Sequence, residues 1–145
     1  MVDFIKSFRT GVHAAQTAEE NKAEINAVFD ELNAQLATVT ENKVRILPLQ
    51  FQEHFSWHNL SKKEIFEPYW GIGVVRTSGG EATEIARWSV SETGYPCAIS
   101  SSSGKFMCSD RKGLESALAM LLQHASVGQT ILEMLSPPTS AEPAP

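Results

Sequence analysis

Apolar and small residues recur in alternating steps of four and three along the first part of the chain, and this spacing constrains the fold more than any other feature. Such steps form the a/d rhythm of a coiled coil, and they also place side chains on one face of a single helix. We therefore predict a helical arm over residues 1–40. The positions are Phe4, Phe8, Gly11, Ala15, Ala18, Ile25, Phe29, Leu32, Leu36 and Val39.

The second half of this arm has the more regular spacing, whereas Gly11 and Lys22 interrupt the first half and predict looser or separate packing there. One interpretation is a coiled coil that makes the protein a homo-oligomer. The other is a helix lying across the sheet of its own domain, because amphipathic helices have nearly the same period. Under the first interpretation the oligomer seam consists of Ile25, Phe29, Leu32, Leu36 and Val39.

Short alternating segments separated by glycine-containing turns follow the arm and predict a small antiparallel β-meander. Ser78-Gly79-Gly80 is typical of a hairpin turn. Pro48 lacks an N–H donor, so the first strand should lie at an edge of the sheet or be bulged. Asp110 is a favourable N-cap for a C-terminal helix, and Gly128 suggests a break before a last short turn.

These segments together indicate an α+β fold with three regions. Residues 1–40 form the heptad-patterned helical arm, and residues 41–135 form the α+β head domain. Residues 136–145, which contain four prolines, form an extended Pro-rich tail. A chain of 145 residues is otherwise expected to hold one domain.

The charge pattern argues against nucleic acid and membranes as partners. The net charge is −5, and lysines and arginines do not cluster as phosphate binding requires. No apolar run approaches the ~20 residues that span a bilayer. The N-terminus also lacks the features of a signal peptide. We expect a cytoplasmic location, or the virion if the chain is phage-encoded.

The two cysteines, Cys97 and Cys108, fall on segments expected to be neighbouring strands. Two small buried thiols are the favoured interpretation in a cytoplasmic protein, with a disulfide as the alternative. A zinc site is not expected, because the chain contains neither a CxxC nor a CxxxC motif.

No motif for catalysis, metal binding or cofactor binding stands out. The run from Ser100 to Lys105 lacks the leading glycine and the final Ser or Thr of a phosphate-binding P-loop. His54 and His58 have helical spacing but no assigned third ligand. The chain also lacks the Gly-x-Ser-x-Gly elbow of many hydrolases. We therefore expect no enzyme activity and no cofactor, although a pocket around Trp57, Trp70 and Trp88 is a weaker alternative.

Aromatic residues concentrate in the middle of the chain, between Phe51 and Trp70. Exposed rings are the usual anchors of protein interfaces, whereas buried rings would form the core between sheet and helices. Both interpretations stay open at this point. The candidate partner-binding residues are Phe55, Trp57, Tyr69 and Trp70.

The arm, the aromatic segment and the tail favour a non-enzymatic structural subunit of a larger protein assembly. A helical arm joined to a compact β-rich head is similar in style to small phage or prophage virion proteins, which would imply a tail or particle protein. The alternative is a small acidic inhibitor or immunity-type protein that binds one partner enzyme, which the size and the pI near 5.3 fit equally well.

Overall fold

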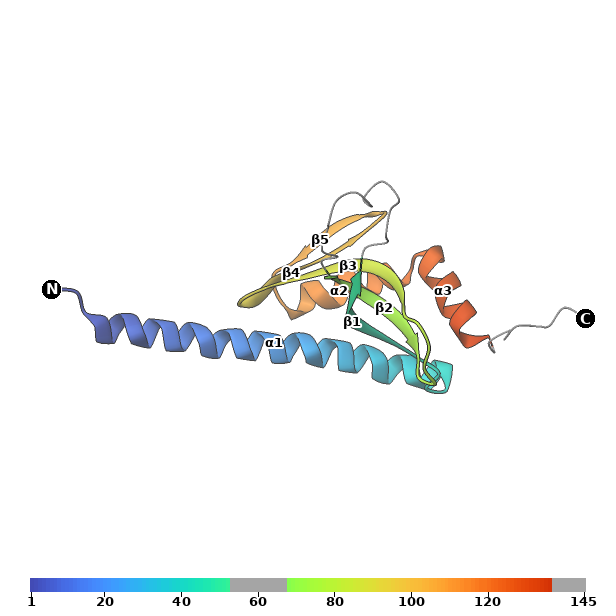
Figure 1. The fold of residues 1–145 in the computed structure, drawn as a ribbon, viewed down its shortest axis with the longest axis horizontal. Coiled ribbons are helices and arrows are strands. Elements are labelled where there is room, and N and C mark those ends of the chain that lie inside the picture. The colour runs from blue at the N-terminus through green and yellow to red at the C-terminus, as the bar shows by residue number, and fades with distance from the viewer. Residues whose placement is uncertain (53–67, 137–145) are drawn as a thin grey trace, which may run out of the picture.

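The computed structural model of the chain describes residues 1–52 and 68–136. A long helix precedes five strands and two shorter helices, so the predicted α+β layout is confirmed (Figure 1). Residues 137–145, which include all four prolines of the predicted tail, lie outside the described residues. The elements are α1 Phe4–Thr40, β1 Val44–Gln52, β2 Pro68–Arg76, β3 Thr83–Ser91, β4 Gly94–Ser101, β5 Gly104–Cys108, α2 Arg111–Leu122 and α3 Ala125–Leu135.

Helix α1 is continuous, and both of its ends have local causes. Asp3 caps the start, where its carboxylate accepts a hydrogen bond from the backbone N–H of Lys6 at 3.1 Å. At the other end, Glu41 and Asn42 adopt left-handed backbone conformations that turn the chain into β1. Gly11 does not interrupt the helix, because a single helical glycine costs only about 1 kcal/mol.

The five strands form an antiparallel meander in the order β1-β2-β3-β4-β5, as the sequence predicts. Strand β1 lies at one edge of the sheet, which suits Pro48 because an outward-facing position needs no N–H donor. A register shift between Ile72 and Gly73 interrupts the pairing of β2 with β3.

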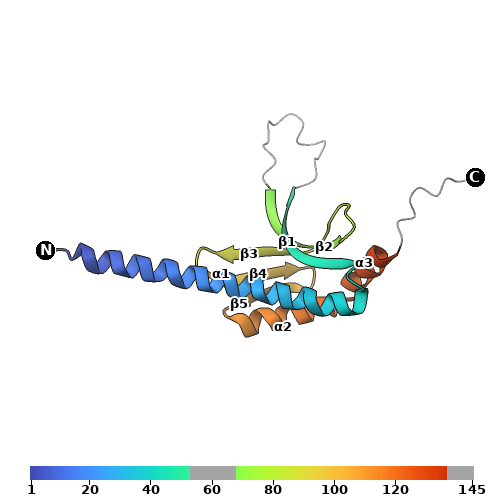
Figure 2. The same ribbon diagram turned by 90° about the horizontal axis from the view of Figure 1, so that it is seen from below.

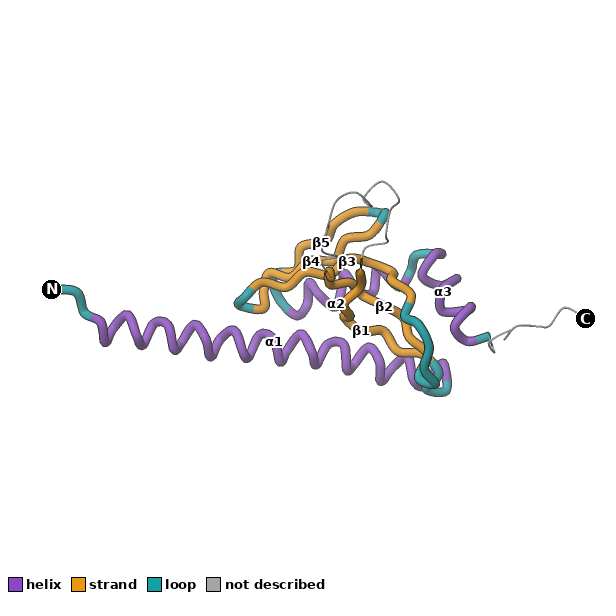
Figure 3. The backbone as a smooth tube through the Cα atoms, viewed as in Figure 1, coloured by secondary structure: helices purple, strands orange, loops and turns teal. Residues whose placement is uncertain are grey.

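All three helices pack on the same face of the sheet, as Figures 2 and 3 show together, and the core lies between them. Alternate strand residues point into this core, as the two-residue period of a strand requires. The second half of α1 contributes to the same core, which therefore includes residues on both sides of residue 40. Its fully enclosed members include Ile46, Ile72, Ile99, Leu114 and Leu121.

The C-terminal region differs from its prediction in one respect. Asp110 caps α2 by accepting from the N–H of Gly113 at 2.7 Å, as expected. The predicted break at Gly128 is wrong, because the chain turns at Gln123 and His124 and then forms the full helix α3. Packing outweighs the modest cost of the glycine, since Val127 and Met134 of α3 are buried in the core.

Side chains of α1 also fasten it to the sheet by hydrogen bonds. The amide of Asn33 donates to the carbonyl of Ile46 at 2.9 Å and accepts from the N–H of Ile46 at 2.8 Å. Nearer the N-terminus, Asn21 Nδ2 donates to the carbonyl of Thr93 at 2.9 Å. The β3–β4 turn lies so close there that a Cβ added to Gly94 would be 2.7 Å from Asn21 Cβ.

Candidate protein-docking surface

The first half of α1 is exposed to solvent, whereas its second half packs on the sheet. Residues 1–16 are all exposed, and among the described residues the first hydrogen bond from α1 to the rest of the chain is the one from Asn21 to the β3–β4 turn. We call residues 4–16 the projecting arm, which extends beyond the sheet in Figure 1. Phe4 and Phe8 keep 75% and 71% of their surface exposed, whereas Phe29 keeps 3%.

The projecting arm has an apolar side and a small excess of positive charge. Phe4, Phe8 and Val12 follow one another at steps of four and therefore lie along one face of the helix. Residues 1–18 contain two cationic side chains, Lys6 and Arg9, and one acid, Asp3, which makes +1. Because the whole chain carries −5, the remaining residues carry −6. A weakly cationic apolar arm thus projects from an acidic body.

A groove of about 470 Å³ runs between the second half of α1 and α2. Its floor is apolar because both helices direct short or branched side chains toward each other there. The floor residues are Val28, Leu32, Leu118, Ala119 and Leu122. A groove with this lining suits an apolar helix face, which is one of the recurring modes of peptide recognition.

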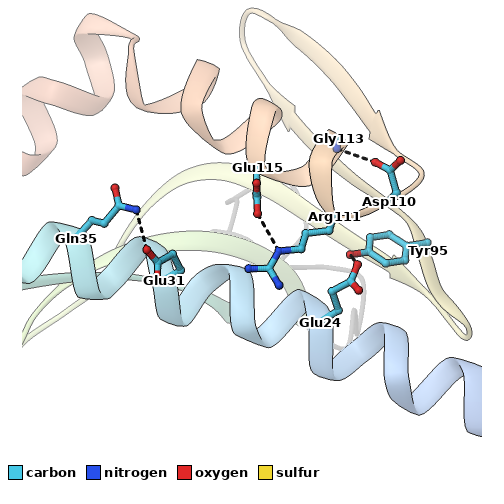
Figure 4. Close-up of polar contacts among 8 residues, drawn as sticks. All are labelled: Glu24, Glu31, Gln35, Tyr95, Asp110, Arg111, Gly113 and Glu115. Atoms are coloured by element: carbon cyan, nitrogen blue, oxygen red, sulfur yellow. Dashed lines mark hydrogen bonds and ion pairs between the residues drawn. The ribbon is translucent and has the colours of Figure 1, made fainter.

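Four polar residues also line the groove, and Figure 4 shows their contacts: Glu31 and Gln35 on α1, and Arg111 and Glu115 on α2. Arg111 Nε donates to Glu115 Oε1 at 2.8 Å, and this bond raises the pKa of the Arg111 guanidinium. Glu31 Oε1 accepts from Gln35 Nε2 at 2.9 Å. Glu31 is exposed, and no ion pair within the described residues uses its carboxylate.

Glu24 anchors α1 to the sheet near the Arg111 end of the groove. The hydroxyl of Tyr95 donates to Glu24 Oε1 at 2.9 Å. Burial, and then this bond to a carboxylate, raise the pKa of Tyr95. The phenol therefore stays protonated at neutral pH and holds the β4 end of the sheet against α1.

The structure places most of the predicted oligomer seam inside the chain's own core. Ile25 and Phe29 are buried, and Leu32 and Leu36 pack partly against the same cluster. Phe29 meets the Trp88 ring edge to face at a centroid distance of 5.4 Å. Val39 is 77% exposed and does not join them. Self-association through the seam stays a prediction, but four of its five residues already have intramolecular partners.

The four residues of the predicted aromatic surface do not form one surface in the described part of the structure. Phe55 and Trp57 lie outside them. Tyr69 and Trp70 are consecutive on β2 and so point to opposite faces of the sheet. Tyr69 lies on the face without helices, where its ring stacks on Phe51. Arg87 Cζ lies 3.5 Å from the centroid of the Tyr69 ring in a cation–π contact. Trp70 remains 49% exposed.

Cys97 and Cys108 face each other across the β4–β5 pair as free thiols, both buried. The predicted placement on neighbouring strands is confirmed. Burial, followed by the neighbouring Cys108, raises the pKa of Cys97 to about 12, and burial also raises the pKa of Cys108. Both thiols are protonated at neutral pH, which makes them poor nucleophiles.

Metal binding and membrane insertion can be checked only in the described part of the chain. Nowhere in residues 1–52 and 68–136 do three His, Cys, Asp or Glu side chains gather closely enough to hold a metal ion. His54 and His58 lie outside those ranges. Within the same part of the chain, no helix combines the length and apolar character needed to cross a membrane.

Sequence reasoning did not identify the exposed face of the projecting arm or the groove between α1 and α2. Phe4 and Phe8 entered only as the irregular start of a heptad pattern, and Glu31, Arg111 and Ala119 were not singled out. One available signal was the run from Phe4 to Ala18, which contains cations but no acid in an acidic chain. Comparison with known proteins adds no further guide, because no family model, curated protein or solved structure matches the chain.

Proposed function

We propose that the chain is a non-enzymatic subunit of a larger protein assembly and that the projecting arm is the part that docks. The observation that carries this proposal is the exposure of Phe4, Ile5, Phe8 and Val12 on a helix that packs on the sheet only in its second half. Contiguous exposed apolar surface on a protein is a mark of an interaction site.

The energetics of a free helix support the same conclusion. Most helical stability in proteins comes from packing of the apolar face, and residues 4–16 continue a packed helix without packing of their own. Burying one large apolar side chain contributes about 1.5–3 kcal/mol. Docking of the arm on another protein would supply the packing that the chain's own sheet does not offer to residues 4–16.

The simplest partner is another copy, which makes the protein a homo-oligomer. The narrower form of the proposal is a phage or prophage virion-type protein, such as a tail or particle subunit located in the virion or the host cytoplasm. Its support is architectural, because a helical arm on a compact head can link neighbouring subunits without any enzymatic site.

Light scattering after size exclusion tests the proposal directly. The wild-type protein should show a mass above that of one 15.9 kDa chain, increasing with concentration. The double variant Phe4→Asp, Phe8→Asp should elute as a monomer, because two charges on the apolar face oppose its burial.

A matched control carries the same two charges on the other face of the arm. The variant Ser7→Asp, Thr10→Asp changes exposed residues of the same helical turns and should keep the wild-type mass. Wild-type protein that stays monomeric at every concentration would count against the homo-oligomer. Equal dissociation by both double variants would count against the apolar face as the docking surface.

A further inference from the structure

The projecting arm and the α1–α2 groove have complementary dimensions and surfaces. From Phe4 to Val12 the arm's apolar face runs for about 12 Å, at ~1.5 Å per residue. The groove follows α2 from Arg111 to Leu122, about 16 Å on the same basis. The apolar face of the arm is therefore shorter than the groove as a whole, and its phenylalanines could contact the apolar residues at the Leu118–Leu122 end.

Charges complement each other across the same pair of surfaces. Arg9 lies beside the apolar face of the arm, and no ion pair within the described residues uses Lys6 or Arg9. The groove offers Glu31 on one rim and the Arg111–Glu115 pair on the other. A cationic arm would place its positive charge near the carboxylate of Glu31, which no ion pair in the described residues uses, and this favours a second copy as the occupant.

An arm cannot reach the groove of its own chain. Helix α1 is continuous from Phe4 to Thr40, so the arm points along the helix axis away from the groove. We infer that the projecting arm of one copy docks into the α1–α2 groove of a second copy. This inference rests on the proposed assembly role and names the surface that receives the arm.

The arrangement of the two surfaces on α1 also determines the symmetry of the assembly. Phe8 in the middle of the arm's apolar face and Glu31 at the groove are 23 residues apart, so at ~100° per residue they point about 140° apart around the axis. Two straight helices related by a two-fold axis would need both surfaces on the same side. Docking is therefore head to tail, and each copy gives one arm and receives one, which produces a ring or a filament.

A lipid surface is the other common occupant of an amphipathic helix, and the observations favour it less. Helices that lie in a membrane interface are rich in Lys and Arg on their polar face. The arm has only Lys6 and Arg9, and the body behind it carries −6. An anionic bilayer would repel that body, whereas a second copy presents the carboxylate of Glu31 to the arm.

Two full-length variants test the projecting arm and the α1–α2 groove separately. Phe4→Asp, Phe8→Asp disables the arm but leaves the groove intact. Ala119→Lys blocks the groove with a long cationic side chain at an exposed position and leaves the arm intact. Met120→Lys is the matched control, because Met120 is exposed on the same helix and does not line the groove. Circular dichroism checks that every variant keeps the wild-type fold.

Each disabled variant alone should be monomeric, with self-association weakened by at least about 30-fold, the effect of losing one binding hot spot. Mixed in equal amounts, the two should form a dimer and nothing larger, because only one arm and one groove remain usable. Met120→Lys should assemble as the wild-type protein does. Sedimentation velocity measures all four samples.

Other outcomes would overturn the inference in distinguishable ways. If Ala119→Lys assembles like the wild-type protein while the arm variant does not, the arm docks on a different surface and the assembly role stands. If the wild-type protein is monomeric and its arm binds vesicles of phosphatidylglycerol and phosphatidylcholine instead, both the inference and the homo-oligomer fail. Disabled variants that mix without forming a dimer would also overturn the inference.

Discussion

The two halves of α1 share one backbone helix and one residue spacing, yet they have different roles in the structure. The second half places Ile25 and Phe29 in the core, while the first half leaves Phe4 and Phe8 in solvent. Asn21 and Gly94 mark the point where contact with the sheet begins. The comparison teaches that a helical period indicates which side chains share a face, but does not indicate whether another element covers that face.

Exchanging a phenylalanine for alanine in each half should give the largest contrast. Phe29→Ala removes a buried ring packed edge to face on Trp88 and should lower the free energy of unfolding by about 3–5 kcal/mol. Phe8→Ala removes an exposed ring and should change the stability of the monomer by less than about 0.5 kcal/mol. Urea denaturation of dilute protein measures both, and comparable losses would contradict the division of α1.

Alanine at a glycine in each region should give a smaller contrast of opposite sign. Gly94 has φ of 89°, and a Cβ there would be 2.7 Å from Asn21 Cβ, so Gly94→Ala should cost about 1–3 kcal/mol. A Cβ at Gly11 would meet no atom within 4 Å. Gly11→Ala should therefore increase helix content and stabilise the arm locally by about 0.5–1 kcal/mol.

Thermal melting and far-ultraviolet circular dichroism distinguish these two glycine effects. Gly94→Ala should lower the melting temperature. Gly11→Ala should increase the helical ellipticity and should not lower the melting temperature. A destabilising Gly11→Ala would show that the arm has packing partners close to residue 11.

Raising the pH should give the smallest change in the free energy of unfolding, and it should act through the contact between Tyr95 and the second half of α1. Burial and the bond to Glu24 raise the pKa of Tyr95 above its ordinary value of about 10. Above that pH the unfolded tyrosine releases its proton while the folded one retains it, so stability falls as pH rises. The loss should be no more than about 1 kcal/mol between pH ~10 and ~11, because water screens the partly exposed ring.

The variant Tyr95→Phe supplies the reference for this measurement. It keeps the ring and lacks the ionisable hydroxyl, so its stability should depend less steeply on pH across the same interval. Identical slopes for the two proteins would show that ionisation of Tyr95 does not weaken the attachment of α1.

The local elements were largely predictable, because their signals are carried by neighbouring residues. Alternation and glycine turns gave the meander, and Asp110 gave the start of α2. The continuation of α3 through Gly128 was missed, because it depends on the burial of Val127 and Met134 by distant segments. Tertiary packing overrides a modest local preference in such places.

The candidate docking surface was predictable only in part. The spacing of Phe4 and Phe8 indicated a helix face, but the exposure of that face depends on where the sheet ends. The groove forms between residues near Leu32 and residues near Leu118, which are far apart in the chain. A pattern confined to one segment cannot indicate such a meeting.

The paired hydrogen bonds between Asn33 and Ile46 have a consequence for aggregation. Strand β1 is an outer strand, and unpaired N–H and C=O groups on such a strand form a template for adding strands from other chains. The Asn33 amide occupies both groups of Ile46 in the way that a neighbouring strand would. Helix α1 thus occupies the position where an added strand would pair with Ile46.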